Sequence, residues 1–113
     1  VSTYSPSIFT NFGANATLNV KAAAGNVHSI YCQNTNAAVR YIQLHNTTTT
    51  PAGGAVPVLS FMIPASGAVF IDHTMLVAGG AYFSLGVAFA YSTTAGTYTA
   101  GTAGEQNTTI FYK

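Results

Sequence analysis

The chain has 113 residues, of which 49% are hydrophobic and 4% are charged, and its formal net charge is +1. This length suits one domain with a single core, and the hydrophobic content excludes a disordered chain, which would combine low hydrophobicity with high charge. Three scattered Lys and Arg residues cannot build the basic cluster that phosphate binding needs, which excludes nucleic acid and a basic membrane-surface helix. A protein with so little net charge tends to associate, so we expect a homo-oligomer or a subunit docked on a larger scaffold.

The N-terminal residues 1–16 are polar and weakly patterned, and we expect them to form an arm in front of a single β-sandwich domain, residues 17–113. The first ten residues lack the basic start and apolar run of a signal peptide. The arm carries three aromatic residues, Tyr4, Phe9 and Phe12. Aromatic side chains are common interface anchors, so we expect the arm to contact a shell or a neighbouring subunit.

Runs of alternating or β-branched residues predict seven strands along the rest of the chain. They cover residues 17–21, 25–33, 39–46, 58–63, 68–72, 82–91 and 108–113. The clearest run is 82–91, in which one face at period two carries Phe83, Leu85, Val87, Phe89 and Tyr91. No segment sustains the apolar spacing of a helix over ten residues.

Turn-forming segments separate these runs. Residues 34–36 are typical of a hairpin turn, residues 64–67 of a tight turn, and residues 47–55 and 93–104 of polar loops, the second with a short strand around Tyr98. The uncharged stretch 74–91 approaches the length of a membrane-spanning helix, but its paired glycines and alternation predict a turn between strands, so we expect no membrane span. We therefore predict an all-β fold, an antiparallel β-sandwich of seven or eight strands that is jelly-roll or Ig-like.

The residues that catalysis or metal binding requires are scarce. His28 and Cys32 are four residues apart, which is about 13 Å on a strand, too far for two ligands of one metal. Asp72 and Glu105 are the whole stock of carboxylates, which leaves no triad and no facing carboxylate pair. We predict a protein that is not an enzyme, with no catalytic residue, no cofactor and no metal, and with Cys32 as a small buried side chain.

Arg40 shares a strand face with the apolar Ile42 and Leu44. One hypothesis is a structural ion pair between Arg40 and Asp72, which would fix the register of an otherwise apolar sheet. The other is an arginine at the solvent end of its strand, and the sequence does not decide between them.

Several motifs together resemble a family. They are VRYIQLHN (39–46), PAGG (51–54), PVLSF (57–61), IPA (63–65), GVAFAYSTTA (86–95), TYTA (97–100) and FYK (111–113). In this order they resemble the small β-sandwich structural proteins of tailed bacteriophages, over residues 39–113. The resemblance implies a virion location and a capsid decoration (cement) protein that assembles as a homo-oligomer, with a trimer favoured, on the major capsid protein or other virion proteins. It carries over no functional residues.

Two alternatives remain. The chain would serve as a tail fibre or baseplate receptor-binding domain if tyrosines such as Tyr41, Tyr82, Tyr91 and Tyr98 lined a sugar-stacking surface. It would otherwise be a subunit of a cellular surface layer or filament. The candidate interaction residues from the sequence are Tyr4, Phe9, Phe12, Tyr82, Tyr91 and Tyr98.

Overall fold

The computed structural model describes residues 7–13, 15–72 and 80–113, and in these ranges it consists of strands and loops with no helix. The strands are β1 (Ser7–Asn11), β2 (Thr17–Lys21), β3 (Gly25–Asn34), β4 (Arg40–His45), β5 (Leu59–Ile63), β6 (Ala68–Ile71), β7 (Ala81–Phe83), β8 (Val87–Ser92) and β9 (Gln106–Tyr112). Every named strand pair is antiparallel. The prediction of an all-β sandwich is confirmed.

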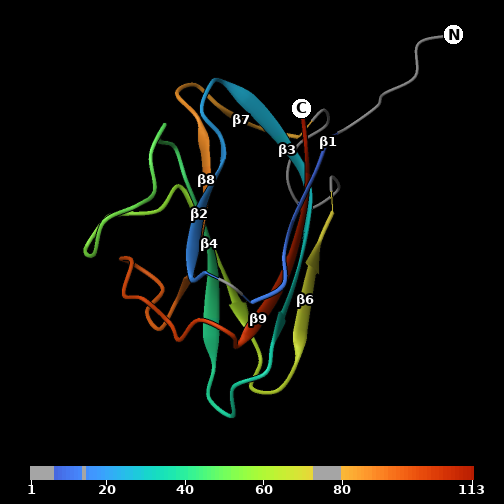
Figure 1. Cartoon of the computed structure of the whole chain (residues 1–113), viewed down its shortest axis with the longest axis vertical. Helices are drawn as coiled ribbons and strands as arrows, with labels where there is room; N and C mark the ends of the chain where they lie inside the picture. The colour runs from blue at the N-terminus through green and yellow to red at the C-terminus, as the bar shows by residue number, and fades with distance from the viewer. Residues whose placement is uncertain (1–6, 14, 73–79) are drawn as a thin grey trace, which may run out of the picture.

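The strands form two sheets that pack face to face (Figure 1). The five-stranded sheet has the order β1-β9-β3-β6, with β7 also paired to β3, and the four-stranded sheet has the order β2-β8-β4-β5. The first strand therefore lies beside the last, and the second beside the last but one, which is the path of a jelly roll. An Ig-like sandwich would place its first two strands side by side in one sheet, whereas β1 and β2 lie in different sheets.

The core is the layer between the two sheets. The inward positions of both sheets supply it, as the period-two patterns predict. Its buried side chains are Val27, Ile30, Cys32, Ile42, Leu44, Ile63, Ile71, Phe83, Val87, Phe89, Tyr91 and Ile110.

Part of the predicted arm is a strand. β1 pairs with β9 along its whole length, from Ser7 opposite Tyr112 to Asn11 opposite Thr108. Phe9 points inward and its ring lies 5.5 Å from that of Phe89. The prediction of a weakly structured arm is wrong for residues 7–11, because the pairing comes from the far end of the chain and leaves no local pattern. Tyr4 lies outside the described residues.

The predicted strand 82–91 is two strands in two sheets. β7 pairs with β3, and β8 pairs with β2 and β4, so the chain crosses between the sheets at residues 84–86. Asn46 fixes the crossing, since its Oδ1 accepts hydrogen bonds from the backbone N–H groups of Leu85 at 2.9 Å and Gly86 at 3.3 Å. Leu85, which the pattern placed inward, is 58% exposed as a result.

The connection at residues 34–39 is not a hairpin, because β3 and β4 belong to different sheets. Asn34, which is 1% exposed, organises this end of the sandwich. Its Nδ2 donates to the carbonyl oxygens of Ala38 and Pro64, and its Oδ1 accepts from the N–H of Asn36 at 2.9 Å and from the hydroxyl of Tyr91 at 2.5 Å. One side chain thus joins the β3–β4 connection, the β5–β6 turn and β8.

We expect Asn34→Ala to lower the free energy of unfolding by about 3 kcal/mol, because several buried groups lose their partner. Tyr91→Phe should cost about 1 kcal/mol, since Oδ1 of Asn34 keeps the Asn36 N–H. Urea denaturation of both variants measures the difference. Equal losses would contradict the role of Asn34 as the shared partner.

Gly86→Ala should destabilise the fold by about 3 kcal/mol or more, because steric overlap with fixed backbone cannot relax. An added Cβ would overlap with the carbonyl oxygen of Thr47 and would lie 2.8 Å from that of Lys21. Gly53 is the matched control, as nothing lies within 4 Å of its Cβ position. Gly53→Ala should change the stability by less than about 0.5 kcal/mol in thermal denaturation. Similar melting temperatures for the two variants would refute the close approach.

Candidate functional site

The described residues hold no group of three or more His, Cys, Asp or Glu side chains that could bind a metal ion. Cys32 is buried in the core, and its Sγ lies 3.3 Å from Oγ1 of Thr108. Burial raises the pKa of the Cys32 thiol to about 11, against the weaker opposing effect of the Thr108 hydrogen bond. The thiol is therefore protonated at neutral pH and is no nucleophile.

The strands of the five-stranded sheet carry no formal charge, since they contain no Asp, Glu, Lys or Arg in the described ranges. The nearest charged residues along the chain are Asp72, just after β6, and Glu105 and Lys113, just before and just after β9. Several outward side chains of this sheet are large and aromatic or aliphatic, and the most exposed are Tyr82 at 66%, Ile8 at 62%, Phe70 at 58% and Tyr31 at 40%. Polar outward residues such as Thr10 and Thr109 lie between them. This face, formed by the outward side chains of β1, β9, β3, β6 and β7, is called the bare face below.

The strand register brings the apolar residues of the bare face together. Tyr31 on β3 lies opposite Phe70 on β6, and Ile8 on β1 lies opposite Phe111 on β9. Directly opposed side chains in an antiparallel pair are about 5 Å apart, and diagonal ones about 7–8 Å. Tyr31 and Phe111 are diagonal neighbours, because Tyr31 faces Thr109 two residues earlier on β9. An apolar stripe therefore crosses the sheet from β1 to β6.

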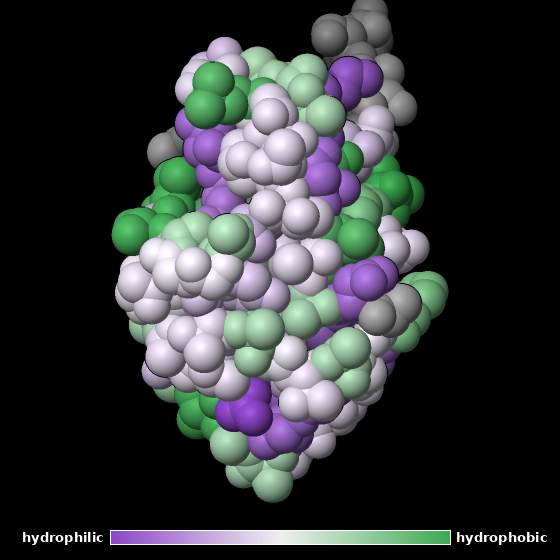
Figure 2. All heavy atoms as spheres, turned by 60° about the vertical axis from the view of Figure 1, so that its left-hand side comes forward, coloured by the Kyte–Doolittle hydropathy of each residue, from purple (hydrophilic) through white to green (hydrophobic). Residues whose placement is uncertain are grey.

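The outer face of the four-stranded sheet differs, because two loops cover it. Figure 1 shows these loops, residues 46–58 in green and residues 93–105 in orange, on the outer side of β4 and β8. Figure 2 views the molecule from this side, where near-neutral residues form a large central area and strongly hydrophobic and hydrophilic residues are scattered around it. The covered positions are polar and yet buried: Gln43 and Ser92 are 0% exposed and His45 is 3% exposed.

Gln43 attaches the second loop to the sheet. Its Nε2 donates to the carbonyl oxygens of Thr94 at 2.8 Å and Thr97 at 3.0 Å, with Ala95 at 3.3 Å. Because Nε2 is committed to carbonyl oxygens, the amide orientation is fixed and Oε1 is the acceptor. Oε1 lies 3.0 Å from Nε2 of His45, so that ring nitrogen carries the proton. In the neutral His45 ring, Nδ1 is therefore the nitrogen without a proton, and it can accept a hydrogen bond.

Tyr98 joins the two loops to each other. Its backbone N–H donates to the carbonyl of Ala55 at 2.7 Å, and its carbonyl accepts from the N–H of Gly54 at 2.8 Å. Its ring packs edge-on against His45, with 6.3 Å between the ring centroids. The two loops and the sheet below them form one connected layer.

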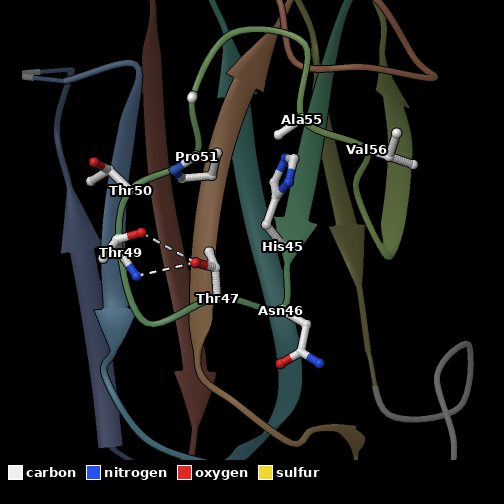
Figure 3. Close-up of a pocket in the computed structure, with 9 residues that line it drawn as sticks. His45, Asn46, Thr47, Thr49, Thr50, Pro51, Ala55 and Val56 are labelled. Carbon is white, nitrogen blue, oxygen red and sulfur yellow. Dashed lines mark hydrogen bonds between the residues drawn. The ribbon is translucent and has the colours of Figure 1, made fainter.

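A pocket of about 280 Å³ opens between β4 and the first loop. Figure 3 shows the His45 ring rising toward Ala55, with Pro51 beside it and Asn46 turned away. The lining residues are His45, Asn46, Thr47, Thr49, Thr50, Pro51, Ala52, Ala55 and Val56. None of them carries a formal charge when His45 is neutral. The pocket wall therefore consists of neutral polar groups, mainly hydroxyl and imidazole groups, and of small apolar side chains.

The structure separates the residues that the sequence suggested for interaction. Phe12 and Tyr82 are 76% and 66% exposed and remain available to a partner. Tyr91 and Tyr98 are 0% and 5% exposed, so the prediction that they form an interaction or sugar-stacking surface is wrong. Phe9 is half-buried against the core. Tyr91 faces the inside of the sandwich, as the period-two pattern of residues 82–91 indicated, whereas Tyr98 is buried within the loop layer, which no pattern within one strand could reveal.

Arg40 and Asp72 are placed at different levels of the sandwich. Arg40 lies opposite Ile63 at the end of β5, whereas Asp72 follows β6, which runs away from that end for four residues or about 13 Å. Nη1 of Arg40 donates to the carbonyl of Val39 at 3.0 Å. The expected Arg40–Asp72 ion pair is therefore replaced by an arginine at the strand end.

A hydrogen bond from the side-chain amide of Asn36 is the main cause that lowers the pKa of Glu105, and the charge of Arg40 makes a smaller contribution in the same direction. Glu105 also accepts the Thr35 N–H at its backbone carbonyl, at 2.8 Å, so it ties the β3–β4 connection to the start of β9.

The sequence reasoning missed the two central members of the bare face, Tyr31 and Phe70. A signal for Phe70 was present, since residues 68–72 are apolar at every position before Asp72, which leaves one apolar set facing outward. Tyr31 lies in the run Ile30-Tyr31-Cys32, where the alternating neighbours are buried.

Comparison with known proteins gives no match to a family model, a curated protein or a solved structure. Within the part of the chain that the structure describes, no helix is long and apolar enough to span a membrane.

Burial lowers the pKa of His45 below its ordinary value of 6.5. The folded protein therefore binds this proton less readily than the unfolded chain, so the free energy of unfolding should be highest above pH 6.5 and should fall as the pH drops below it. In His45→Gln this contribution is absent, and the stability difference between wild type and variant should shrink toward acid pH. Urea denaturation across the acid range measures it. A difference that stays constant with pH would contradict the lowered pKa.

Proposed function

We propose that the protein is a non-enzymatic structural subunit of a virion, a capsid decoration protein that assembles with copies of itself through the bare face. The observation that carries the proposal is the uncharged apolar stripe of Ile8, Phe111, Tyr31 and Phe70 on an open sheet. The outward face of an antiparallel sheet is ordinarily polar. An exposed contiguous apolar patch indicates a surface that another protein covers.

The absence of charge on these strands favours a second copy as the occupant. Two bare faces can meet without burying a formal charge from the described strands, so association avoids the desolvation penalty of ions. It also avoids repulsion between identical surfaces, which a charged face would suffer. Aromatic residues at the centre of the patch, Tyr31 and Phe70, are of the type that anchors interfaces.

The size of the bare face favours many contacts over one strong contact. The face is four strands wide, because β6 and β7 share one side of β3. At about 4.8 Å per strand, and with strands of about seven residues at about 3.4 Å each, it covers roughly 450 Å² in projection. A standard interface buries about 800 Å² per partner. One contact of this size holds two copies weakly, whereas copies bound side by side on a repeating shell gain strength from multivalency.

The fold and the sequence resemblance support the virion setting. Jelly rolls form viral capsid domains, and they also form lectins. Because one fold serves several functions, the proposal rests on the bare face together with the resemblance of residues 39–113 to structural proteins of tailed bacteriophages. In this setting the other partner is the major capsid protein or another virion protein. The resemblance favours a trimer, which would need a heterologous contact in addition to the two-fold contact between bare faces.

Phe70→Lys tests the bare face, with Met62→Lys as its control. The two residues are 58% and 55% exposed on edge strands of opposite sheets, so both substitutions add the same charge at similar exposure. We expect the wild type and Met62→Lys to form oligomers with rising concentration in analytical ultracentrifugation, and Phe70→Lys to remain monomeric. A monomeric wild type, or equal effects of the two substitutions, would overturn assembly through this face.

The virion setting has a separate test, which is the copy number of the chain in purified particles. Quantitative mass spectrometry should find hundreds of copies per particle for a decoration protein. A few to tens of copies would replace decoration with the tail fibre or baseplate alternative. Absence from particles, with filaments formed by the isolated protein, would favour the cellular surface-layer or filament subunit.

A further inference from the structure

The pocket beside His45 is built on a long, anchored loop. The loop spans residues 46–58, between the end of β4 and the start of β5, and loops of this length without secondary structure are uncommon outside functional sites. Its first residue, Asn46, is hydrogen-bonded to the crossing at residues 84–86. At its other end, the backbone N–H of Val58 donates to the carbonyl oxygen of Leu44 at 2.9 Å. The middle of the loop is paired to Tyr98. The pocket is therefore preformed, as small-molecule sites usually are.

The hydrogen-bonding groups of the pocket are neutral. Nδ1 of His45 has no partner among the described residues and is not one of their buried unpartnered atoms, so it remains open to the pocket as an acceptor. Thr50 contributes a hydroxyl that no described residue binds, whereas Thr47 and Thr49 bond to each other. An acceptor beside hydroxyl groups suits a ligand that both donates and accepts hydrogen bonds.

The remaining surface of the pocket is apolar and small. Pro51, Ala52, Ala55 and Val56 contribute carbon surface around these polar groups, and Val56 is 74% exposed at the rim. The volume of about 280 Å³ lies just below the range typical of ligand sites, about 300–1,000 Å³, which suits a small ligand. A nucleotide or other phosphate ester is disfavoured, because no lining residue is a Lys or Arg.

We propose that this pocket binds one terminal neutral sugar residue of a glycan, with Nδ1 of His45 accepting a hydrogen bond from a sugar hydroxyl. A sugar ring combines hydroxyl groups with C–H faces, which match the Thr and His groups and the Pro51 and Ala52 surfaces respectively. The site is independent of the bare face, since it lies on the loop-covered side of the other sheet. A decoration protein carrying it would attach particles to glycan-coated surfaces through many weak contacts.

The test is binding of the full chain to an array of immobilised glycans that end in neutral hexoses, N-acetylhexosamines, sialic acids or sulfated sugars. We expect binding to a subset of the neutral glycans. Ala52→Trp should fill the pocket and reduce that binding at least tenfold. Ala103→Trp is the matched control, because Ala52 and Ala103 are both exposed loop alanines and Ala103 is not part of the pocket.

A second measurement places the sugar at His45. Titration of the free terminal monosaccharide should shift the His45 imidazole signals in NMR spectra of the wild type and of Ala103→Trp, but not of Ala52→Trp. Circular dichroism spectra of both variants should match that of the wild type. Binding only to sialylated or sulfated glycans, equal binding by the two variants, or no glycan binding by the wild type would each overturn the proposal.

Discussion

The side-chain amide of Gln43 is the group on which the loop layer of this protein depends. Placed on the outward face of β4, it would ordinarily be solvated, but it is fully buried and donates to carbonyl oxygens of the loop 93–105. Those bonds replace the water that the loop excludes, so the burial of a polar residue costs little. The same amide sets the tautomer of His45 through its oxygen. The position of one loop and the hydrogen-bonding character of a pocket formed by another thus follow from one residue.

The sandwich has two unlike outer surfaces as a consequence. The four-stranded sheet is covered by its own loops, whose Thr, Gly and Ala residues give a near-neutral skin (Figure 2). The five-stranded sheet has no such cover among the described residues, and its outward side chains include Tyr31 and Phe70. A low charged fraction serves both surfaces, because an uncharged loop layer packs onto an uncharged sheet and the bare face meets copies of itself without repulsion. The two proposals concern opposite sides of the molecule, so assembly would leave the pocket accessible.

Much of the fold could be predicted from local patterns, since period-two alternation marked the inward residues of β4 and β8. The predicted strand 17–21 coincides with β2. What could not be predicted depends on distant partners. Residues 7–11 form the strand β1 because they pair with β9. The run 82–91 divides into two strands because the side chain of Asn46 binds the backbone N–H of Gly86. Burial of Tyr98 likewise depends on the distant loop 46–58, so the exposure of this tyrosine could not be inferred from its residue type.

The pairing of β3 limits how copies of this chain can associate. β9 occupies one side of β3, and the other side is shared by two short strands, β6 opposite residues 30–33 and β7 opposite residues 25–27. On this side the sheet therefore ends in two short segments instead of one long run of open backbone groups, and its opposite edge is the five-residue strand β1. Long open edges are the templates for strand addition and fibril growth. Many copies of an apolar protein with such a divided sheet edge can therefore gather on a surface without forming fibrils. Side-chain contacts between two faces stop once both faces are covered, whereas strand addition at an open edge can continue without limit.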